Sequence, residues 1–222
     1  MAGGSTVSLS FWIWSHLSFV LIVASMVCPL LRRLSRLQSM LLCLLIPLAV
    51  GLLPIHQTDV SGFALAHTGT LSASTLLLIL FQLLTEWRLV EPLSTQVWRN
   101  INLFWISLGI VVYPSALGLL DVDTYVFGYQ DAMSWCVLIA SGIAVYCRYR
   151  ILGLCLASAV LAHLLSLHES PNLWDYLIDP WLCLAAVCAL IAASCRRLFA
   201  AKPRDDVPSD VANPGATNLG DS

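Results

Sequence analysis

Four histidines lie near the ends of long apolar stretches, where their imidazoles could do chemistry. His67 and His163 each lie about one helical turn inside such a stretch. An ionisable side chain at that depth is a functional hint by default. A neutral imidazole beside a carboxylate can bind zinc or act as an acid–base pair. The candidate catalytic residues are therefore His67, His163, His168 and Glu169, with His56 as the remaining histidine of the group.

Two carboxylates form a second candidate group. Asp175 and Asp179 are four residues apart, so a helix places them on one face. Like charges at this spacing repel each other unless a cation offsets them, and hard cations prefer carboxylate oxygens. We favour the simpler interpretation, in which one aspartate caps a helix and the other is solvated. The candidate metal ligands are His67, His163, Asp175 and Asp179.

The spacing of these residues matches none of the usual catalytic or metal-binding motifs. HExxH and HxxxH are absent, and the five residues from His163 to His168 place the two rings on different faces of a helix. The serines in the stretch 61–75 are not flanked by glycines as in a GxSxG elbow. For each histidine alone, a hydrogen bond to a neighbouring carbonyl is the simpler interpretation. No motif implies a cofactor.

Small residues recur at every fourth position within the same stretch. A face of this kind lets another helix approach closely, or lets the protein self-associate. Its members are Gly62, Ala66, Thr70 and Ser74. We expect tight packing among the third, sixth and seventh apolar segments, because the last two carry similar series. Those series consist of Gly153 and Ala157, and of Ala185, Ala189 and Ala193.

The composition of the whole chain is typical of a membrane protein. Its 222 residues are 59% apolar and 11% charged, with a mean hydropathy of +0.82. A soluble domain, in contrast, is about a quarter charged. Seven segments are long and apolar enough to cross a hydrocarbon core of about 30 Å. We predict an all-α bundle of seven transmembrane helices at Leu9–Leu31, Leu37–Ile55, Phe63–Leu84, Ile101–Leu120, Ala132–Cys147, Ile151–Leu167 and Pro180–Cys195.

The short last segments allow a second topology, and the two ends of the chain differ from the bundle in composition. The alternative has six spans plus a re-entrant segment around residues 125–147, since the last three segments are short for spans of about 20 residues. The N-terminal stretch lacks a basic region ahead of its apolar run, so we interpret it as a retained span. We predict a bundle over residues 1–198 and a disordered cytoplasmic tail over residues 199–222, which is rich in Pro, Asp, Asn and Gly.

The basic residues sort to one side of this seven-span arrangement. With the N-terminus outside, all 11 lysines and arginines fall in loops on one side or in the tail. Cytoplasmic loops are enriched in Lys and Arg, so we place that side and the C-terminus in the cytoplasm. The excess of arginine over lysine and the mostly short loops favour the inner membrane of a bacterium.

The acidic and aromatic segment 167–181 predicts a short helix before the last span. Ser170 followed by Pro171 is typical of a helix start. The apolar residues that follow lie on one face of a helix and the polar residues on another, as in a helix that lies in the membrane interface. The pair Asp179 and Pro180 repeats the start signal for the last span.

These features together favour a non-catalytic protein. The centres of the spans contain no Asp, Glu, Lys or Arg, which counts against an ion-coupled transporter. We expect an accessory inner-membrane protein that binds a partner protein or lipid through its packed spans and its acidic, aromatic outer rim. Its surroundings are the lipid bilayer, and we expect no nucleic acid partner. The alternative is a membrane-embedded hydrolase or transferase, metal-dependent or acid–base, with a His/Glu centre near the outer face.

Overall fold

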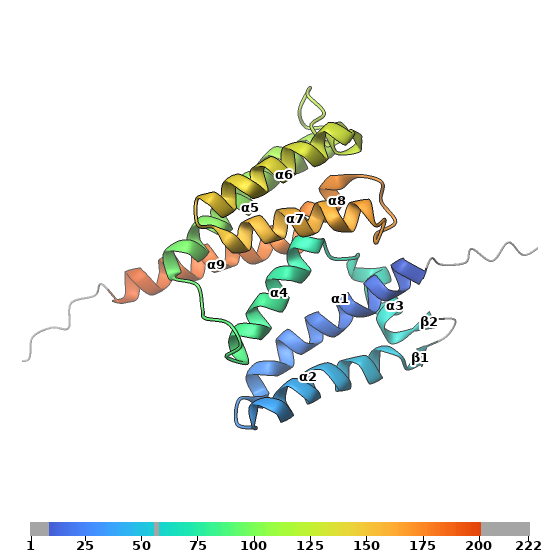
Figure 1. Cartoon of the computed structure of the whole chain (residues 1–222), viewed down its shortest axis with the longest axis vertical. Coiled ribbons are helices and arrows are strands. Elements are labelled where there is room, and N and C mark those ends of the chain that lie inside the picture. Colours follow the sequence, from blue (N-terminus) through green and yellow to red (C-terminus); the bar gives the residue numbers. More distant parts are fainter. Residues whose placement is uncertain (1–8, 56–57, 201–222) are drawn as a thin grey trace, which may run out of the picture.

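Helices form about three quarters of the chain that this computed structural model describes, which is residues 9–55 and 58–200, with side chains to residue 197 (Figure 1). The all-α class is therefore confirmed. The helices are α1 (Leu9–Val27), η1 (Cys28–Leu31), α2 (Arg36–Gly51), α3 (Val60–Thr68), α4 (Ala73–Glu86), α5 (Thr95–Ala116), η2 (Tyr125–Tyr129), α6 (Asp131–Tyr146), α7 (Arg150–Leu164), α8 (Leu173–Leu177) and α9 (Pro180–Ala200). Two short strands, β1 (Pro54–Ile55) and β2 (Thr58–Asp59), pair antiparallel.

Two helical segments among the described residues are long and apolar enough to cross a membrane. They are Leu9–Leu31 and Pro180–Arg197, and a third is added if α3 and α4 count as one span. The helices α2, α6 and α7 are apolar but shorter. A helix of 16 residues such as α2 is about 24 Å long at 1.5 Å per residue, against a hydrocarbon core of about 30 Å. The two or three candidate spans indicate a membrane protein.

The prediction of one continuous helix over Phe63–Leu84 is wrong. The segment forms α3 and α4, whose axes differ by 120°. Gly69 ends α3 with a φ of 76°, a backbone conformation that glycine adopts at little cost. Ser72 then begins α4, because its side chain accepts a hydrogen bond from the backbone N–H of Thr75. Within the region of the alternative re-entrant segment, residues 125–147, the chain forms η2 and then a continuous α6 from Asp131 to Tyr146.

The small-residue face predicted for this segment is also wrong as a continuous surface. Gly62 and Ala66 lie on α3, Thr70 lies in the break, and Ser74 lies on α4. Because the two helix axes diverge, these residues do not line one face. Gly62 has a local role instead, since its backbone N–H donates to Asp59 Oδ1 at 2.7 Å and so takes part in the cap of α3.

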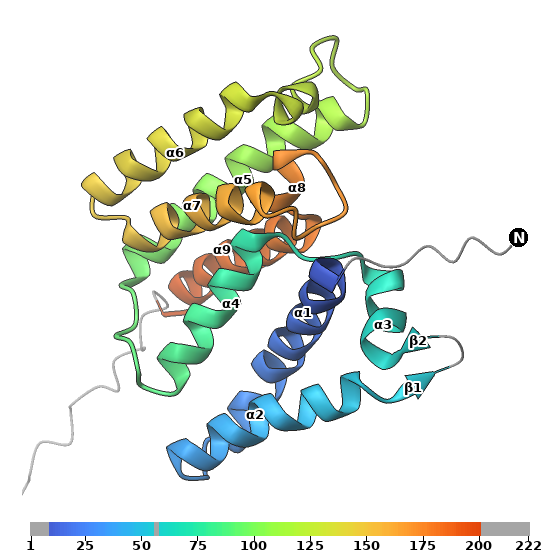
Figure 2. The same ribbon diagram turned by 45° about the vertical axis from the view of Figure 1, so that its right-hand side comes forward.

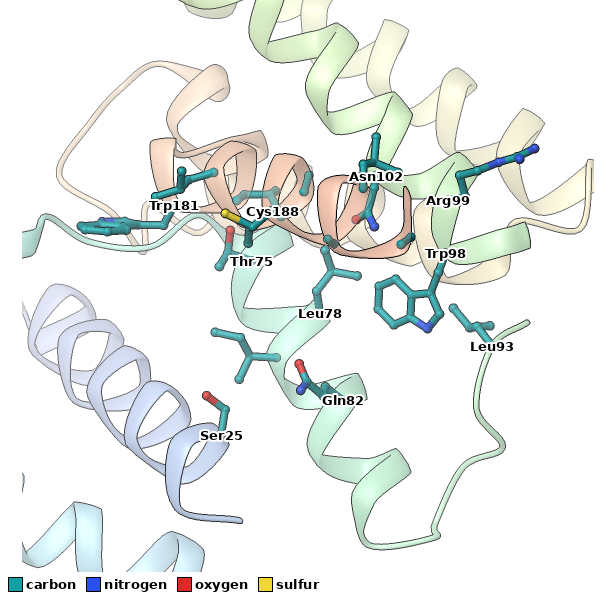
Figure 3. A pocket seen from close by; sticks show the side chains of 18 of the residues that line it. Ser25, Thr75, Leu78, Gln82, Leu93, Trp98, Arg99, Asn102, Trp181 and Cys188 are labelled. Carbon is teal, nitrogen blue, oxygen red and sulfur yellow. The ribbon is translucent and has the colours of Figure 1, made fainter. Parts of the chain in front are cut away.

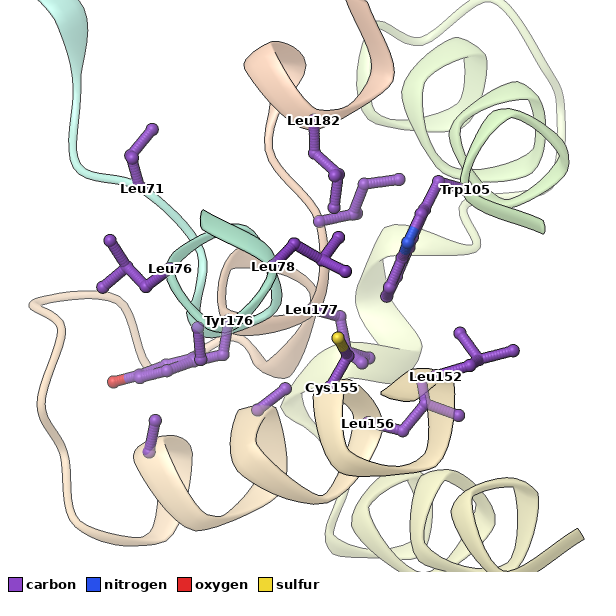
Figure 4. Packing of buried hydrophobic residues seen from close by; sticks show 14 of the residues in the cluster. Leu71, Leu76, Leu78, Trp105, Leu152, Cys155, Leu156, Tyr176, Leu177 and Leu182 are labelled. Atoms are coloured by element: carbon purple, nitrogen blue, oxygen red, sulfur yellow. The ribbon is translucent and has the colours of Figure 1, made fainter. Parts of the chain in front are cut away.

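The helix α4 lies between two groups of helices (Figures 1 and 2). On one side it packs against α1, which forms a hairpin with α2. On the other side it packs against α7, which in turn lies along α6, while α9 lies along α5. Figure 4 shows how Cys155 and Leu156 of α7 meet residues of α4, α5 and α8 in this core. The predicted packing of the third and sixth segments is therefore observed.

The short helix before the last span is present, but protein covers it. Four of the five residues of α8 are buried, and Asn172, not Ser170, caps it by accepting from the N–H of Trp174 at 2.9 Å. The Asn172 side chain also donates to the carbonyl of Tyr125, which joins α8 to η2. The prediction that this helix exposes a polar face is thus wrong. Its aromatic side chains fill the core instead of facing lipid headgroups.

Candidate functional site

A buried carboxylate joins α4 to the start of α9. Asp179 is 5% exposed and follows α8 directly. Its Oδ2 accepts hydrogen bonds from the Ser72 N–H at 2.8 Å and from the Thr75 hydroxyl at 2.5 Å. Its Oδ1 accepts from the Leu182 N–H at 2.7 Å. Asp179 therefore caps α9, as predicted, and also fixes the position of the first turn of α4.

Two tryptophans hold the break between α3 and α4 from other directions. Trp14 of α1 donates its indole N–H to the carbonyl of Leu71 at 3.2 Å. Trp181 of α9 donates to the carbonyl of Thr68 at 2.9 Å. A break in a helix frees backbone carbonyls, and these indoles satisfy two of them. We call the residues around the break, Thr68 to Thr75, together with Asp179, the outer junction.

The two aspartates proposed as metal ligands have separate partners. Asp175 Oδ1 accepts from the Tyr125 hydroxyl at 2.7 Å, whereas Asp179 is satisfied within the outer junction. Burial, together with the hydrogen bond to Asp175, raises the pKa of Tyr125, so this hydroxyl stays protonated. No group of three or more His, Cys, Asp or Glu is placed to hold a metal ion in the part of the chain that the structure describes.

His168 lies against the outer junction as a hydrogen-bond donor. Its Nδ1 accepts from the backbone N–H of Ser170 at 3.1 Å, and its Nε2 contacts the Thr70 hydroxyl. A neutral ring that accepts at Nδ1 carries its proton on Nε2, so Nε2 donates to Thr70 and cannot take a proton from it. Burial lowers the pKa of His168 despite the nearby carboxylates of Asp175 and Glu169, and favours this neutral form.

The other proposed catalytic residues have different surroundings. His67 is exposed on α3, with its Nδ1 2.8 Å from the carbonyl of Phe63, so the simpler interpretation fits this residue. His163 packs edge-on against Tyr176, and its Nδ1 is buried without a hydrogen-bond partner. The contacts described for His67 and for His163 thus involve different residues. Glu169 is exposed at a cavity of about 330 Å³, and His56 lies outside the described residues.

Sequence reasoning overlooked one histidine, His16, which is buried within α1. Its Nε2 lies 3.3 Å from Asp59 Oδ2, and its Nδ1 lies 2.9 Å from the carbonyl of Trp12. Burial raises the pKa of Asp59, but hydrogen bonds from Gly62 and Ser61 and the proximity of His16 outweigh this, and the pKa is lowered. The depth rule that singled out His67 applies equally to His16 and could have found it.

A groove of about 930 Å³ separates α4 from α9 (Figure 3). Its walls are mostly apolar and come from α1, α4, α5 and α9. The small side chains of α9 leave this space open. They include Ala185, Ala189 and Ala193, which the sequence predicted to be packing residues. That prediction is wrong for the seventh segment, because α9 packs along α5 and not closely along α4 or α7.

The two ends of the groove differ in polarity. Thr68 and Trp181 lie at the end next to the outer junction, while Arg99, Arg196 and Arg197 lie at the other. None of these arginines forms an ion pair with a carboxylate in the described ranges 9–55 and 58–197. In Figure 3, the Arg99 side chain points away from the apolar middle of the groove, beyond Asn102. The groove is thus an apolar channel with a cationic end.

Comparison of the chain with protein-family models, with curated proteins and with solved structures finds no match.

Proposed function

We propose that this protein is an accessory membrane protein that binds the acyl chain of a membrane lipid in the groove between α4 and α9. The observation that carries the proposal is the groove itself, about 930 Å³ in volume and walled mainly by apolar side chains. Binding sites for small apolar ligands are concave, mostly apolar and of this size. Of the two partner classes expected from the sequence, a partner protein or a lipid, the groove favours the lipid.

The exposure of α9 supports this proposal. Within the candidate span Pro180–Arg197, only 11% of the most apolar window is buried inside the protein. Such a helix needs an apolar environment along most of its surface, and the bilayer supplies one. Several of the α9 side chains that line the groove are small, among them Ala185, Ala189 and Ala193, and they leave room for a flexible hydrocarbon chain. A lipid tail thus completes the packing between α4 and α9.

The proposal includes the seven-span topology in the inner membrane of a bacterium, with α3 and α4 together forming one broken span. The one-sided distribution of all 11 basic residues supports it. The outer junction then lies at the outer face, and the arginine end of the groove lies at the cytoplasmic face. Reporter fusions after residues 125 and 149 should read as outside and cytoplasmic, respectively. A cytoplasmic reading at 125 contradicts this topology.

We favour this role over a membrane hydrolase or transferase. In the alternative, His168 or His163 has to exchange a proton with a substrate or hold a metal with Glu169. His168 donates from Nε2 to Thr70 and accepts at Nδ1, so both ring nitrogens are already engaged. In this arrangement the Nε2 of His168 cannot accept a proton from Thr70. His163 has an Nδ1 without a hydrogen-bond partner, but it forms no ion pair with a carboxylate among the described residues.

The test is lipid retention on purification in a mild detergent, measured by native mass spectrometry. Ala189→Trp puts a large side chain into the groove and should abolish lipid retention. Ala192→Trp is the matched control, because Ala192 is exposed on α9 but does not line the groove. Thermal unfolding of both variants checks that they fold. Equal lipid retention by wild type and a folded Ala189→Trp variant contradicts the proposed function.

A further inference from the structure

The arginines at one end of the groove lack a carboxylate partner among the described residues, whereas Arg32 has one. Arg32 donates to both carboxylate oxygens of Glu86, at 3.1 and 2.8 Å, in a two-pronged ion pair. Arg99, Arg196 and Arg197 have no such carboxylate among the residues described, and the Nε of Arg99 is buried without a hydrogen-bond partner. Three arginines therefore line one end of an apolar groove without an ion-pair partner among the described residues.

We infer that the groove selects a phospholipid with an anionic headgroup, whose phosphate binds at Arg99, Arg196 and Arg197. A planar guanidinium donates two parallel hydrogen bonds to phosphate, which an ammonium group does not do. The inference rests on the proposed function, since the same lipid places its tail along α4 and α9. It adds the chemical class of the headgroup and the residues that recognise it.

The positions of the polar groups agree with a lipid that enters tail first toward the outer junction. Asn102 faces the groove near the cationic end and can donate to a headgroup oxygen, while Leu78 lines the middle (Figure 3). In the seven-span topology the cationic end lies at the cytoplasmic leaflet. The anionic lipids of this leaflet attract basic side chains. One molecule thus satisfies both the apolar walls and the unpaired cations.

The experiment compares two lipids with identical acyl chains, phosphatidylglycerol and phosphatidylcholine, added to the delipidated full-length protein in detergent. Binding of each lipid is titrated by native mass spectrometry. Wild type should prefer phosphatidylglycerol by a factor of about ten. The double variant Arg196→Gln/Arg197→Gln should lose most of this preference and bind phosphatidylcholine as wild type does. Arg99→Gln should weaken the preference in the same direction.

The matched control is Arg148→Gln/Arg150→Gln, which removes two exposed arginines between α6 and α7 that do not line the groove. It should keep the wild-type preference. Equal binding of the two lipids by wild type, or an unchanged preference in the Arg196→Gln/Arg197→Gln variant, overturns the headgroup inference alone. Ala189→Trp separates the two proposals, because the failure of the proposed function appears as normal binding of both lipids by that variant.

Discussion

The two sides of α4 use similar small residues for opposite purposes. Toward α7, the side chain of Cys155 is fully buried, and the Ser74 hydroxyl donates a hydrogen bond to the backbone carbonyl of Cys155 at 3.4 Å. Toward α9, Ala189 and Ala193 face a groove of about 930 Å³. A series of small residues allows helices to approach closely but does not make them do so. The neighbours that anchor each helix decide which outcome occurs.

The anchors of α9 explain why the groove opens. At its first turn, α9 is fixed to α4 through Asp179, and farther along it follows α5. Gly109 of α5 permits this close contact, since a Cβ at that position lies 2.5 Å from Cys183 Sγ. Because α4 and α5 diverge from the outer junction, α9 moves away from α4 along its length (Figures 1 and 2).

The largest predicted effect is the loss of stability when Asp179, which anchors α9 to α4, is replaced. Asp179→Ala leaves the N–H groups of Ser72 and Leu182 without their acceptor in a buried site, and leaves the Thr75 hydroxyl with the Ser72 hydroxyl as its remaining partner. We expect it to lower the free energy of unfolding by about 3 kcal/mol or more, because each unsatisfied buried donor costs roughly 1–3 kcal/mol. Chemical unfolding in detergent micelles measures this.

The control for this anchor is Asp175→Ala, four residues earlier. Asp175 is half-buried and accepts one hydrogen bond, from Tyr125. We expect a loss of about 1 kcal/mol, typical of a single hydrogen bond. If the two alanine variants are equally stable, Asp179 does not hold α4 and α9 together, and the comparison between the two sides of α4 loses its explanation.

The next prediction compares the packed interface between α6 and α7 with the open side of α4. A Cβ on Gly153 lies 2.5 Å from Val145 Cγ2 and 2.9 Å from the Ser141 carbonyl oxygen. Gly153→Leu should therefore force α6 and α7 apart and cost about 2 kcal/mol. Gly142→Leu is the glycine control, since a Cβ there meets no atom within 4 Å. On the open side, Ala189→Leu should change stability by less than about 0.5 kcal/mol. A similar loss in all three variants rejects the distinction.

The helices could be predicted from the sequence because long apolar runs and their polar ends are local features. Except for the third, each predicted segment overlaps one long helix, although α5 begins at Thr95, ahead of the predicted Ile101, and the first segment ends in η1. The break at Gly69 was missed because the apolar run continues through it, although Gly69 followed by Ser72 carries both an end signal and a start signal. The composition of a run gives its hydrophobicity, and single residues within it decide whether the helix continues.

The groove could not be predicted, because it depends on how three helices diverge in space. The alanine series of α9 was visible in the sequence, but its partner was not. Asp179 was recognised as a cap, whereas its bonds to Ser72 and Thr75 span more than 100 residues and have no local signature. Arg99, Arg196 and Arg197 entered the topology argument as loop charges. Their place at the end of a groove is a tertiary feature.

The smallest predicted effect concerns the contact of His168 with the outer junction, and it is a pH dependence. The pKa of His168 is lowered from its ordinary value of 6.5, so the unfolded chain binds the proton more readily than the folded protein. The stability due to the neutral ring is therefore complete above pH 6.5. It declines as the pH falls through the lowered pKa, because protonated Nδ1 no longer accepts from the Ser170 N–H. Burial drives this shift against the opposing charges of Asp175 and Glu169.

His168→Gln keeps a donor near Thr70 but does not titrate, so it should flatten the fall in melting temperature between pH 7 and about pH 4.5. Asp59 does not interfere in this window, because its own pKa lies below 3.8. His67→Gln is the control, since that ring is exposed on α3, and it should leave the pH profile unchanged. Two results would contradict this prediction: a wild-type melting temperature that is constant over this range, or a His168→Gln profile identical to that of wild type. Either one shows that the neutral ring of His168 does not help to hold the outer junction. In that case Asp179, Trp14 and Trp181 hold the outer junction without a contribution from His168.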